Sequence, residues 1–549
     1  MTSGSARLRS ALLPGLPLVL FLAVALYQLD LPGPNYDEAI EARPAVQLLL
    51  GQPVEAHRQA VVRFAGREWP LMVVDYVGGL NIYALWAMFR LAGIGVVTMR
   101  LWPVAVAVLI LVLTWRLGCR AGGPMVGLVA AMGLAVHPSY VFFARQGIYV
   151  TNTTIAFSLG ILLALIRLVE TGRRRWWYLA AFLAGLGLWA KFIMAWPLVA
   201  TVLLAFPAWR WRQQLGLPTS AFHPRALLTP AALIGGVGAL GLGLAPLLLF
   251  NVQTGATLRH FLATLDRSYY GVANTAYGAN LLTRIEQLGH FLRGDHFWYL
   301  GGIFGDPLAP WIWLGGLIIV LITAFTASAA RPQRAARWGL LFYALVGLLL
   351  LQSPLTPTAL WYTHLALFSP FLALSTALAG AALWERLPPG RRGLAAFAVV
   401  LVLALGSLRA DWNYHRSLRS SGGMANHSDA IYRLSDVLLA GGFVRPYALD
   451  WGFAAPLVLV SQGRIQPIEV FGYDRIETPP PDLADVLRPL LAQPDTVFLL
   501  HAPDRTNFGG RRELLVELAA AQGLRLQTLA VVHERSGALY AEVIRPLPP

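Results

Sequence analysis

The sequence has 549 residues, of which 56% are hydrophobic and only 13% are charged, whereas soluble domains are about 25% charged. This composition excludes an ordinary soluble protein and indicates a membrane protein. The formal net charge is 43 − 28 = +15, but the arginines gather in short loops between hydrophobic stretches, as the positive-inside rule describes. No nucleic-acid-binding motif is present, so we expect no nucleic-acid partner.

The first hydrophobic run, 11–29, follows Arg7 and Arg9 and has no clear small-residue cleavage site. We therefore expect a retained first membrane helix, with a signal peptide as the alternative. The single cysteine, Cys119, excludes an internal disulfide and any site with several cysteine ligands.

Eleven runs are long enough to cross a bilayer, which takes roughly 17–25 residues each. A further segment, 78–95, is hydrophobic but short, and it contains Asn81 and Arg90. The eleven predicted spans are 11–29, 99–117, 124–143, 152–168, 176–191, 193–209, 228–250, 308–327, 337–352, 362–384 and 393–410.

Loop charges set the predicted orientation. If 78–95 lies along the outer surface and the N-terminus is cytoplasmic, every arginine cluster between later spans falls inside. If 78–95 crossed, all of them would lie outside. We therefore predict eleven spans and an outer C-terminus. The clusters are Arg120, 173–175, Arg210 with Arg212, 331–337, and Arg386 with 391–392.

Three outer segments follow from this topology: a first loop at 30–98, a later loop at 251–307, and a tail from about 411. The tail alternates amphipathic stretches at 428–439, 483–491 and 511–522 with hydrophobic runs at 496–502 and 526–532. This pattern predicts a small α/β domain, 411–549, after an α-helical membrane domain, 1–410, that also carries interfacial helices. We expect a plasma (inner) membrane protein whose C-terminal domain is extracytoplasmic.

The middles of the spans hold essentially no ionisable residues, and His137, Lys191 and His364 fall near outer helix ends. Transporters and channels place such residues near the membrane midplane. The pattern favours chemistry at the outer surface.

An acidic pair, Asp37 and Glu38, follows the first span in the segment YDEA. Asn35 and Glu38 have the spacing of a capping box, and a carboxylate in a first turn suits the helix dipole. The pair is therefore either a helix start alone or a reactive group as well.

An ordered set of segments resembles the C-type glycosyltransferases, above all the protein O-mannosyltransferases and bacterial aminoarabinose transferases. It extends over roughly 10–410, and the C-terminal tail lies outside it. The segments are YDEA at 36–39, PLMVVDYVGGLNIYALWAMFRLAG at 70–93, TMRLWPVAVAVL at 98–109, HPSYVFFARQG at 137–147, GLGLWAKF at 185–192, DHFWYL at 295–300 and DPLAPWIWL at 306–314.

The resemblance implies an inverting transfer of a hexose or pentose from a polyprenyl-phosphate donor to a hydroxyl of a lipid, glycan or protein. Asp37 would be the general base, with Glu38 orienting it or the acceptor. Lys191 and Arg145 would bind the donor phosphate; a snorkelling lysine and an interfacial anchor are the alternatives. His296 and Tyr299 would bind substrate or form an aromatic belt. Tyr76, in the segment 70–93, is a further substrate-binding candidate.

The sequence departs from the family before the penultimate span, where relatives carry a lysine followed by a tyrosine and this chain reads SPLTPTALWYTH at 353–364. No His/Cys cluster has metal-ligand spacing, so we expect no catalytic metal and no cofactor. An oligosaccharide donor ranks below a monosaccharide donor, because enzymes that use oligosaccharides usually add further acidic residues and a metal, and 144–152 contains no acidic residue. Alternatives from other classes are a lipid or polysaccharide transporter and a non-catalytic membrane scaffold whose outer domain binds a partner.

Overall fold

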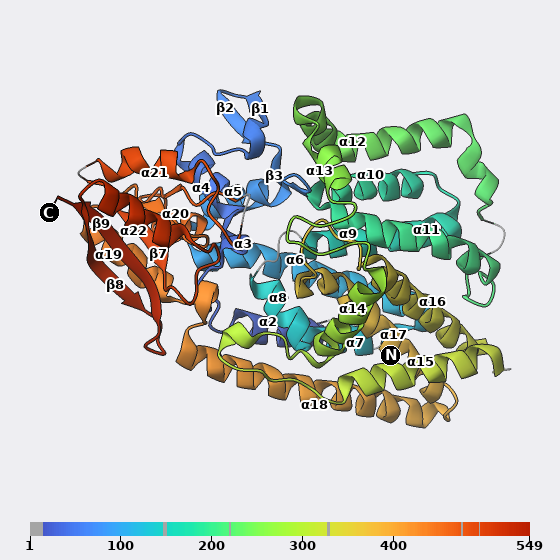
Figure 1. The fold of residues 1–549 in the computed structure, drawn as a ribbon. Helices are drawn as coiled ribbons and strands as arrows, with labels where there is room; N and C mark the ends of the chain where they lie inside the picture. Colours follow the sequence, from blue (N-terminus) through green and yellow to red (C-terminus); the bar gives the residue numbers. More distant parts are fainter. Residues whose placement is uncertain are drawn as a thin grey trace.

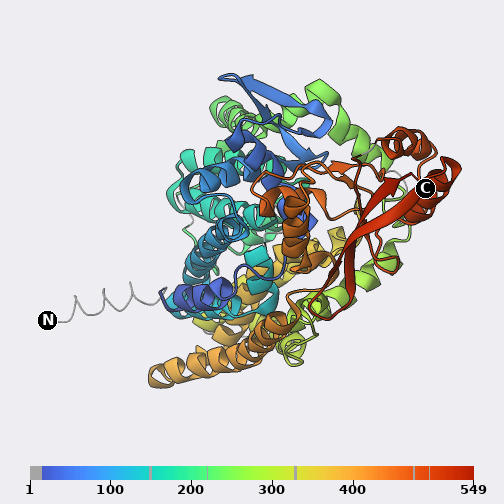
Figure 2. The ribbon, with the colours of Figure 1, turned by 90° about the vertical axis from the view of Figure 1, so that its left-hand side faces the viewer.

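The computed structural model describes residues 15–146, 151–218, 221–326, 330–473, 476–493 and 495–548. Long helices run side by side through most of the molecule, and a smaller part with a β-sheet sits at one end of them, at the left of Figure 1. Figure 2 views the molecule from that end.

Within the described residues, eight helices are long and apolar enough to cross a membrane, or nine if one bent pair counts as a single span. The fold is therefore the mainly helical membrane fold that the sequence predicts. The eight are α6 (Val96–Gly122), α9 (Thr151–Thr171), η2 with α11 (Phe192–Arg210), α12 (Pro230–Thr254), α15 (Ala309–Thr326), α16 (Ala330–Gln352), η5 with α17 (Tyr362–Trp384) and α18 (Pro389–Ser421).

The bent pair is α7 (Pro124–Ala135) and α8 (Pro138–Gln146), which meet at 65°. Pro138 has no N–H to continue the preceding helix, so the chain breaks there. The predicted span 124–143 is therefore two helices with a turn between them.

Two more predicted spans coincide with shorter helices, α2 (Gly15–Leu26) and α10 (Arg175–Ala190). Residues 11–14 of the first predicted span lie outside the described residues. The count of eleven therefore stays a prediction. The segment 78–95 forms α5 (Leu80–Ala92), whose 13 residues extend only about 20 Å, less than the hydrocarbon thickness of about 30 Å.

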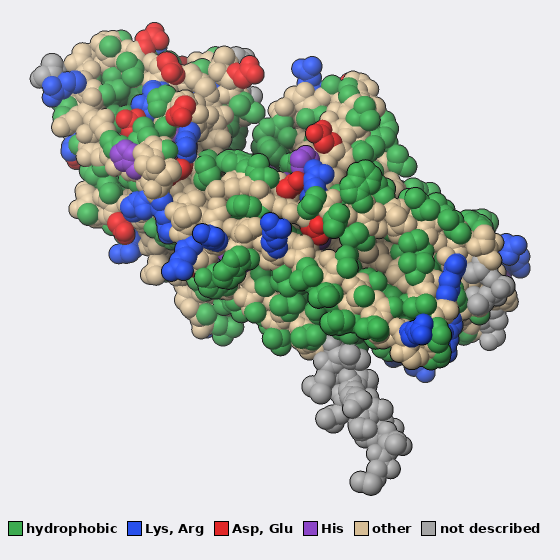
Figure 3. Space-filling view, turned by 90° about the horizontal axis from the view of Figure 1, so that it is seen from below, with side chains coloured by type: hydrophobic (Ala, Val, Ile, Leu, Met, Phe, Trp, Pro, Cys, Tyr) green, Lys and Arg blue, Asp and Glu red, His purple; other side chains and the backbone are tan. Residues whose placement is uncertain are grey.

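Large apolar side chains are exposed along several of the long helices, as expected where helices face lipid. Figure 3 shows hydrophobic side chains spread over one face of the helical part. Exposed examples are Val202 and Phe206 on α11, Ile234 and Val237 on α12, Ile318 and Phe325 on α15, and Leu394 and Phe397 on α18.

Helix ends that carry the predicted inner arginines come together. The Arg334 guanidinium at the start of α16 donates to the main-chain O of Arg120 near the end of α6 (2.7 Å). Trp338 Nε1 donates to the main-chain O of Leu215, which follows α11 (3.1 Å). These contacts agree with an alternating arrangement of the spans; which end is cytoplasmic stays a prediction.

The two long loops that the sequence predicts to lie outside, called the first and the later outer loop, carry short elements. β1 pairs with β2, and β3 with β4, each pair antiparallel. The first loop contains α3 (Tyr36–Ala39), α4 (Ala42–Leu50), η1 (His57–Gln59), β1 (Val61–Phe64), β2 (Arg67–Pro70), β3 (Met72–Val74) and β4 (Val77–Gly78). The later loop contains α13 (Ala256–Ala263), α14 (Tyr277–Arg293) and η4 (Trp298–Leu300). A further short helix, η3 (Pro224–Leu228), precedes α12.

The C-terminal part contains a five-stranded sheet in the order β6-β5-β7-β9-β8. β5 is parallel to β6 and β7, whereas β9 is antiparallel to β7 and β8. The elements are η6 (Ala425–His427), α19 (Ala430–Ala440), β5 (Tyr447–Ala448), α20 (Ala454–Val460), β6 (Ile468–Glu469), α21 (Leu483–Leu491), β7 (Phe498–His501), α22 (Arg511–Ala521), β8 (Arg525–His533) and β9 (Leu539–Leu547).

Both faces of this sheet are covered by helices. Leu499 and Val543 pack with α19 and α20, while their neighbours Leu500 and Ile544 pack with α21 and α22. The alternation follows from the two-residue period of a strand. The predicted boundary at 410 falls inside α18, which continues to Ser421. This helix therefore joins the membrane part to the α/β part without a linker.

Candidate active site

Asp37 lies on the one-turn helix α3, whose start is fixed by the predicted capping box. The Asn35 side-chain oxygen accepts from the Asp37 N–H (2.8 Å), and the Asn35 N–H donates to Glu38 Oε1 (2.9 Å). The prediction of a helix start is therefore confirmed. Asp37 is half-buried while Glu38 is buried, so of the two acids Asp37 is the more accessible from outside the protein.

Glu38 forms a buried ion pair with Arg100. The guanidinium donates to both carboxylate oxygens, at 2.5 and 3.1 Å, and also to the main-chain O of Leu29 and Pro32. The Arg100 side chain is 0% exposed and that of Glu38 4%. Burial raises the pKa of the Glu38 carboxyl, and the charge of Arg100 opposes that rise. Glu38 therefore anchors α3 to α6.

Asp37 interacts electrostatically with Lys191 and with three tyrosines, Tyr76, Tyr269 and Tyr270. The hydroxyls of Tyr76 and Tyr269 lie 3.1 Å apart, and the rings of Tyr269 and Tyr270 are 4.3 Å apart. Residues of both loops and of the end of α10 thus interact electrostatically with one carboxylate.

Lys191 is buried at the break between α10 and η2, where its backbone is extended. It forms a β-bridge with Val77, and the next residue, Phe192, donates its N–H to the main-chain O of Tyr76 (3.0 Å). A Cβ on Gly78 would lie 2.2 Å from the main-chain O of Trp189, so only glycine allows this approach. Strand β4 therefore holds Lys191 beside Tyr76.

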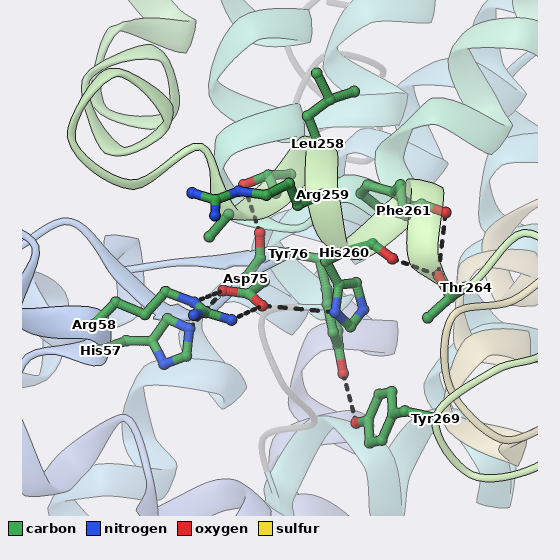
Figure 4. A network of polar contacts seen from close by, with 12 residues as sticks. His57, Arg58, Asp75, Tyr76, Leu258, Arg259, His260, Phe261, Thr264 and Tyr269 are labelled. Atoms are coloured by element: carbon green, nitrogen blue, oxygen red, sulfur yellow. Dashed lines mark hydrogen bonds and ion pairs between the residues drawn. The ribbon is translucent and has the colours of Figure 1, made fainter. Parts of the chain in front are cut away.

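The position of Tyr76 is set by its neighbour Asp75, the centre of the polar network in Figure 4. Arg58 donates to both Asp75 oxygens (2.6 and 2.8 Å), and His57 Nε2 lies 2.7 Å from Oδ1. His260 of α13 lies 3.6 Å from Oδ2. Burial opposes ionisation of Asp75, but the hydrogen bonds from Arg58 and His57 outweigh it and hold its pKa well below the usual range. This network links the first outer loop to the later one.

Glu41 is a further buried acid of the first loop, and sequence reasoning missed it. It accepts from Asn81 Nδ2 (2.8 Å), while Trp102 Nε1 donates to the Asn81 carbonyl oxygen (3.0 Å). Burial raises the pKa of Glu41 to about 7, opposed by the Asn81 hydrogen bond and the charge of Lys191. The only sequence signal was a polar Asn81 inside the apolar segment 78–95.

Glu38 and Glu41 both line a small cavity of about 20 Å³. That volume holds about one water molecule. Its lining also includes Asn81, Arg100 and Gln146. Tyr299 donates to Gln146 Oε1 (2.7 Å), and its ring stacks on His427 of η6 at 3.8 Å. The predicted site residue Tyr299 therefore contacts both a residue that lines this cavity and the C-terminal part.

Arg145 and His296 are held in buried structural environments. Arg145 is 0% exposed, and its guanidinium donates to the main-chain O of Tyr27, Gln28 and Leu31, in the segment that follows α2. The Arg145 guanidinium therefore holds the segment that follows α2 in place.

His296 lies 3.0 Å from Ser139 Oγ and stacks against Phe291 and Tyr362. Burial lowers its pKa well below the usual value, which keeps the ring neutral. Among the described residues, no group of three or more His, Cys, Asp or Glu side chains is arranged to hold a metal ion.

Residues 80–223 match the dolichyl-phosphate-mannose-protein mannosyltransferase family. ArnT from Cupriavidus metallidurans, bound to undecaprenyl phosphate, superposes with a TM-score of 0.60 over 99% of this chain and 98% of ArnT, at 12% identity. The chain has the C-type glycosyltransferase fold. The apo form of the same ArnT gives a TM-score of 0.60 over 98% of both chains, again at 12% identity.

The archaeal oligosaccharyltransferase AglB from Archaeoglobus fulgidus gives a TM-score of 0.48 at 11% identity, over 85% of this chain and 65% of AglB. No curated protein is significantly similar in sequence. The family match and the fold confirm the resemblance that the ordered segments carry, and together with the long apolar helices they make the chain an integral membrane protein.

Proposed function

We propose that the protein is a glycosyltransferase that moves a sugar from a polyprenyl-phosphate donor to an acceptor hydroxyl at the outer face of the membrane. One observation carries this proposal: within a C-type glycosyltransferase fold, the half-buried Asp37 sits on an anchored helix and interacts electrostatically with Lys191. A base and a cation in one site are what displacement of a phosphate leaving group needs.

In the proposed reaction, Asp37 takes the proton of the acceptor hydroxyl as its oxygen attacks the anomeric carbon from the face opposite the phosphate. The new glycosidic C–O bond forms while the bond from the anomeric carbon to the phosphate oxygen breaks. The leaving oxygen keeps the electron pair, and the configuration inverts. Lys191 stabilises the negative charge of the departing polyprenyl phosphate.

The donor is proposed to be lipid-linked because nucleotide sugars made in the cytoplasm do not reach an outer site. The undecaprenyl phosphate in the ArnT structure supports such a donor. The acceptor would be a lipid, glycan or protein of the cell envelope. We place the protein in the plasma membrane, with the N-terminus cytoplasmic and the C-terminal domain extracytoplasmic.

The surroundings of Asp37 favour an enzyme over a scaffold. A scaffold requires neither an acid beside a lysine nor a cavity beside the acidic pair. Here Asp37 is half-buried near Lys191, and its neighbour Glu38 lines a cavity.

The test uses purified protein in lipid nanodiscs, undecaprenyl-phosphate-linked mannose and aminoarabinose as donors, and a cell-envelope extract as acceptor. Release of undecaprenyl phosphate and labelling of the extract are followed for wild type, Asp37→Asn and Asp30→Asn. Asp30 is an exposed acid of the same loop, so its variant is the matched control.

Asp37→Asn should reduce transfer at least 100-fold, as loss of a general base does, while Asp30→Asn should stay within twofold of wild type. Undiminished transfer by Asp37→Asn would remove Asp37 from the mechanism. If the wild type transfers sugar from neither of the two donors, that result would count against both donors.

A further inference from the structure

The C-terminal domain contacts the residue that precedes Asp37. The Tyr36 hydroxyl lies 2.8 Å from that of Tyr473, which donates to Glu469 Oε2 (3.1 Å). Since a phenol has one proton and Tyr473 gives its proton to Glu469, Tyr36 donates to Tyr473. The Tyr36 ring also packs on Trp451, with 4.8 Å between the ring centres.

Beneath these polar contacts, the first outer loop and the C-terminal domain share one hydrophobic core. Ala39 of α3 and Val46 of α4 pack in the same cluster as Ala454 and Val458 of α20. All four side chains are 0% exposed. The helix that carries Asp37 is therefore buried against both parts of the chain.

The start of α3 is also held from the C-terminal side. Asn35 Nδ2 donates to the main-chain O of Asn426 (3.4 Å) and lies 3.3 Å from His427 Nε2. A Cβ on Gly33 would lie 2.1 Å from the main-chain O of Ser428, so the two segments are in close contact. The residue that caps the Asp37 helix is thus fixed by η6.

Helix α3 has only four residues, and a helix of that length has no stability of its own. Its position is decided by what it packs against. A general base must lie within hydrogen-bond reach of its proton, and a misplacement of about 1 Å costs about 100-fold in rate. The contacts around Tyr36 therefore bear directly on the reactivity of the next residue.

We propose that the C-terminal domain positions Asp37 for glycosyl transfer, and that Tyr473 and Glu469, acting through Tyr36, are positioning residues of that reaction. The proposal rests on the proposed function. It gives the C-terminal domain a role that the sequence segments resembling the family leave open, because all of those segments lie before residue 410.

The hydrogen bonds that link Tyr36, Tyr473 and Glu469 persist at ordinary pH. A phenol ordinarily has a pKa of about 10, and burial raises the pKa of the Tyr36 hydroxyl well above that value, with the charge of Glu469 adding to the rise. Both phenols are therefore protonated and able to donate near neutral pH.

The experiment measures kcat and the donor KM for Tyr473→Phe, Glu469→Ala and Glu469→Gln in the full-length protein. Tyr447→Phe is the matched control, because this tyrosine belongs to the same domain and its ring packs against Phe498 in the sheet. Hydrogen exchange of residues 36–41 is measured on the same samples and needs no substrate.

Tyr473→Phe and Glu469→Ala should lower kcat about tenfold, in line with the loss of one hydrogen bond, and leave the donor KM within twofold. Glu469→Gln keeps an acceptor for the Tyr473 hydroxyl and should be milder. Hydrogen exchange of residues 36–41 should be faster than in wild type in the two severe variants, Tyr473→Phe and Glu469→Ala. In Tyr447→Phe it should equal that of wild type. In an Asp37→Asn background, Tyr473→Phe should cost nothing further, since there is no base left to position.

An unchanged kcat in both severe variants would overturn the positioning role, as would a change confined to the donor KM. A tenfold loss that persists in the Asp37→Asn background would do the same, because it would act independently of Asp37. These results differ from failure of the proposed function, in which the wild type itself transfers no sugar.

Discussion

Glu38→Gln tests whether the buried ion pair with Arg100 holds the first outer loop in place. The substitution keeps the shape of the side chain and an oxygen that can accept from the Asn35 N–H, but it removes the negative charge. Arg100 is then an uncompensated cation at 0% exposure. Removal of one partner from a buried pair costs about 3–5 kcal/mol, and we expect the lower end because one hydrogen bond to Arg100 can remain.

The assay is unfolding in mixed micelles, with sodium dodecyl sulfate as the denaturant and the free energy of unfolding compared among variants. Glu68→Gln is the control, because Glu68 pairs with Arg63 at the surface, where the side chains are 45% and 83% exposed. That variant should lose at most about 1 kcal/mol.

Arg100→Met should be more destabilising than Glu38→Gln. It removes the same ion pair and also leaves the main-chain O of Leu29 and Pro32 without their donor. The expected destabilisation is largest for Arg100→Met, smaller for Glu38→Gln and smallest for Glu68→Gln. The reasoning fails if Glu38→Gln loses no more than the surface control, or if Arg100→Met is the milder of the two buried changes.

Two further predictions concern the same loop. The pKa of Glu41 rises from 4.5 to about 7 on folding, so its contribution to stability is complete below pH 4.5 and disappears as the pH rises to 7, a loss of roughly 3 kcal/mol. Glu41→Gln stays neutral and should flatten the free energy of unfolding over that interval; an unchanged slope would show that Glu41 does not titrate there. Gly78→Ala should push β4 away from Trp189 and cost about 1–3 kcal/mol, with reduced transfer activity because β4 holds Lys191. Gly95→Ala is its control, since nothing lies within 4 Å of a Cβ at Gly95, and equal behaviour of the two alanine variants would contradict the packing argument.

Much of the fold follows from local patterns in the sequence. The amphipathic stretch 483–491 is helix α21 (Leu483–Leu491), because its apolar residues recur at helical spacing and meet the sheet on one face. The hydrophobic run 526–532 is the middle of strand β8 (Arg525–His533). The long spans could also be predicted locally, because the composition of a long apolar segment identifies it as a membrane helix.

The candidate site was less predictable, because its partners are distant in sequence. The acidic pair and its cap are local, so the start of α3 could be foreseen. The pairing of Glu41 with Asn81 depends on how α5 folds back, and no local pattern encodes it. Arg145 shows the same limit, since a sequence cannot tell an arginine that faces lipid headgroups from one that donates to main-chain carbonyls.

The shared core of α4 and α20 has a consequence for how the protein matures. Tyr432 donates to the main-chain O of Asp30 across 402 positions of sequence, and residues of α20 complete the hydrophobic cluster that contains Ala39 of α3. A ribosome adds these residues after α18, the last of the long apolar helices among the described residues. The nascent chain therefore spends most of its synthesis with the acidic turn incomplete, and the site can be assembled only once the C-terminal part has been made and has packed against the first loop.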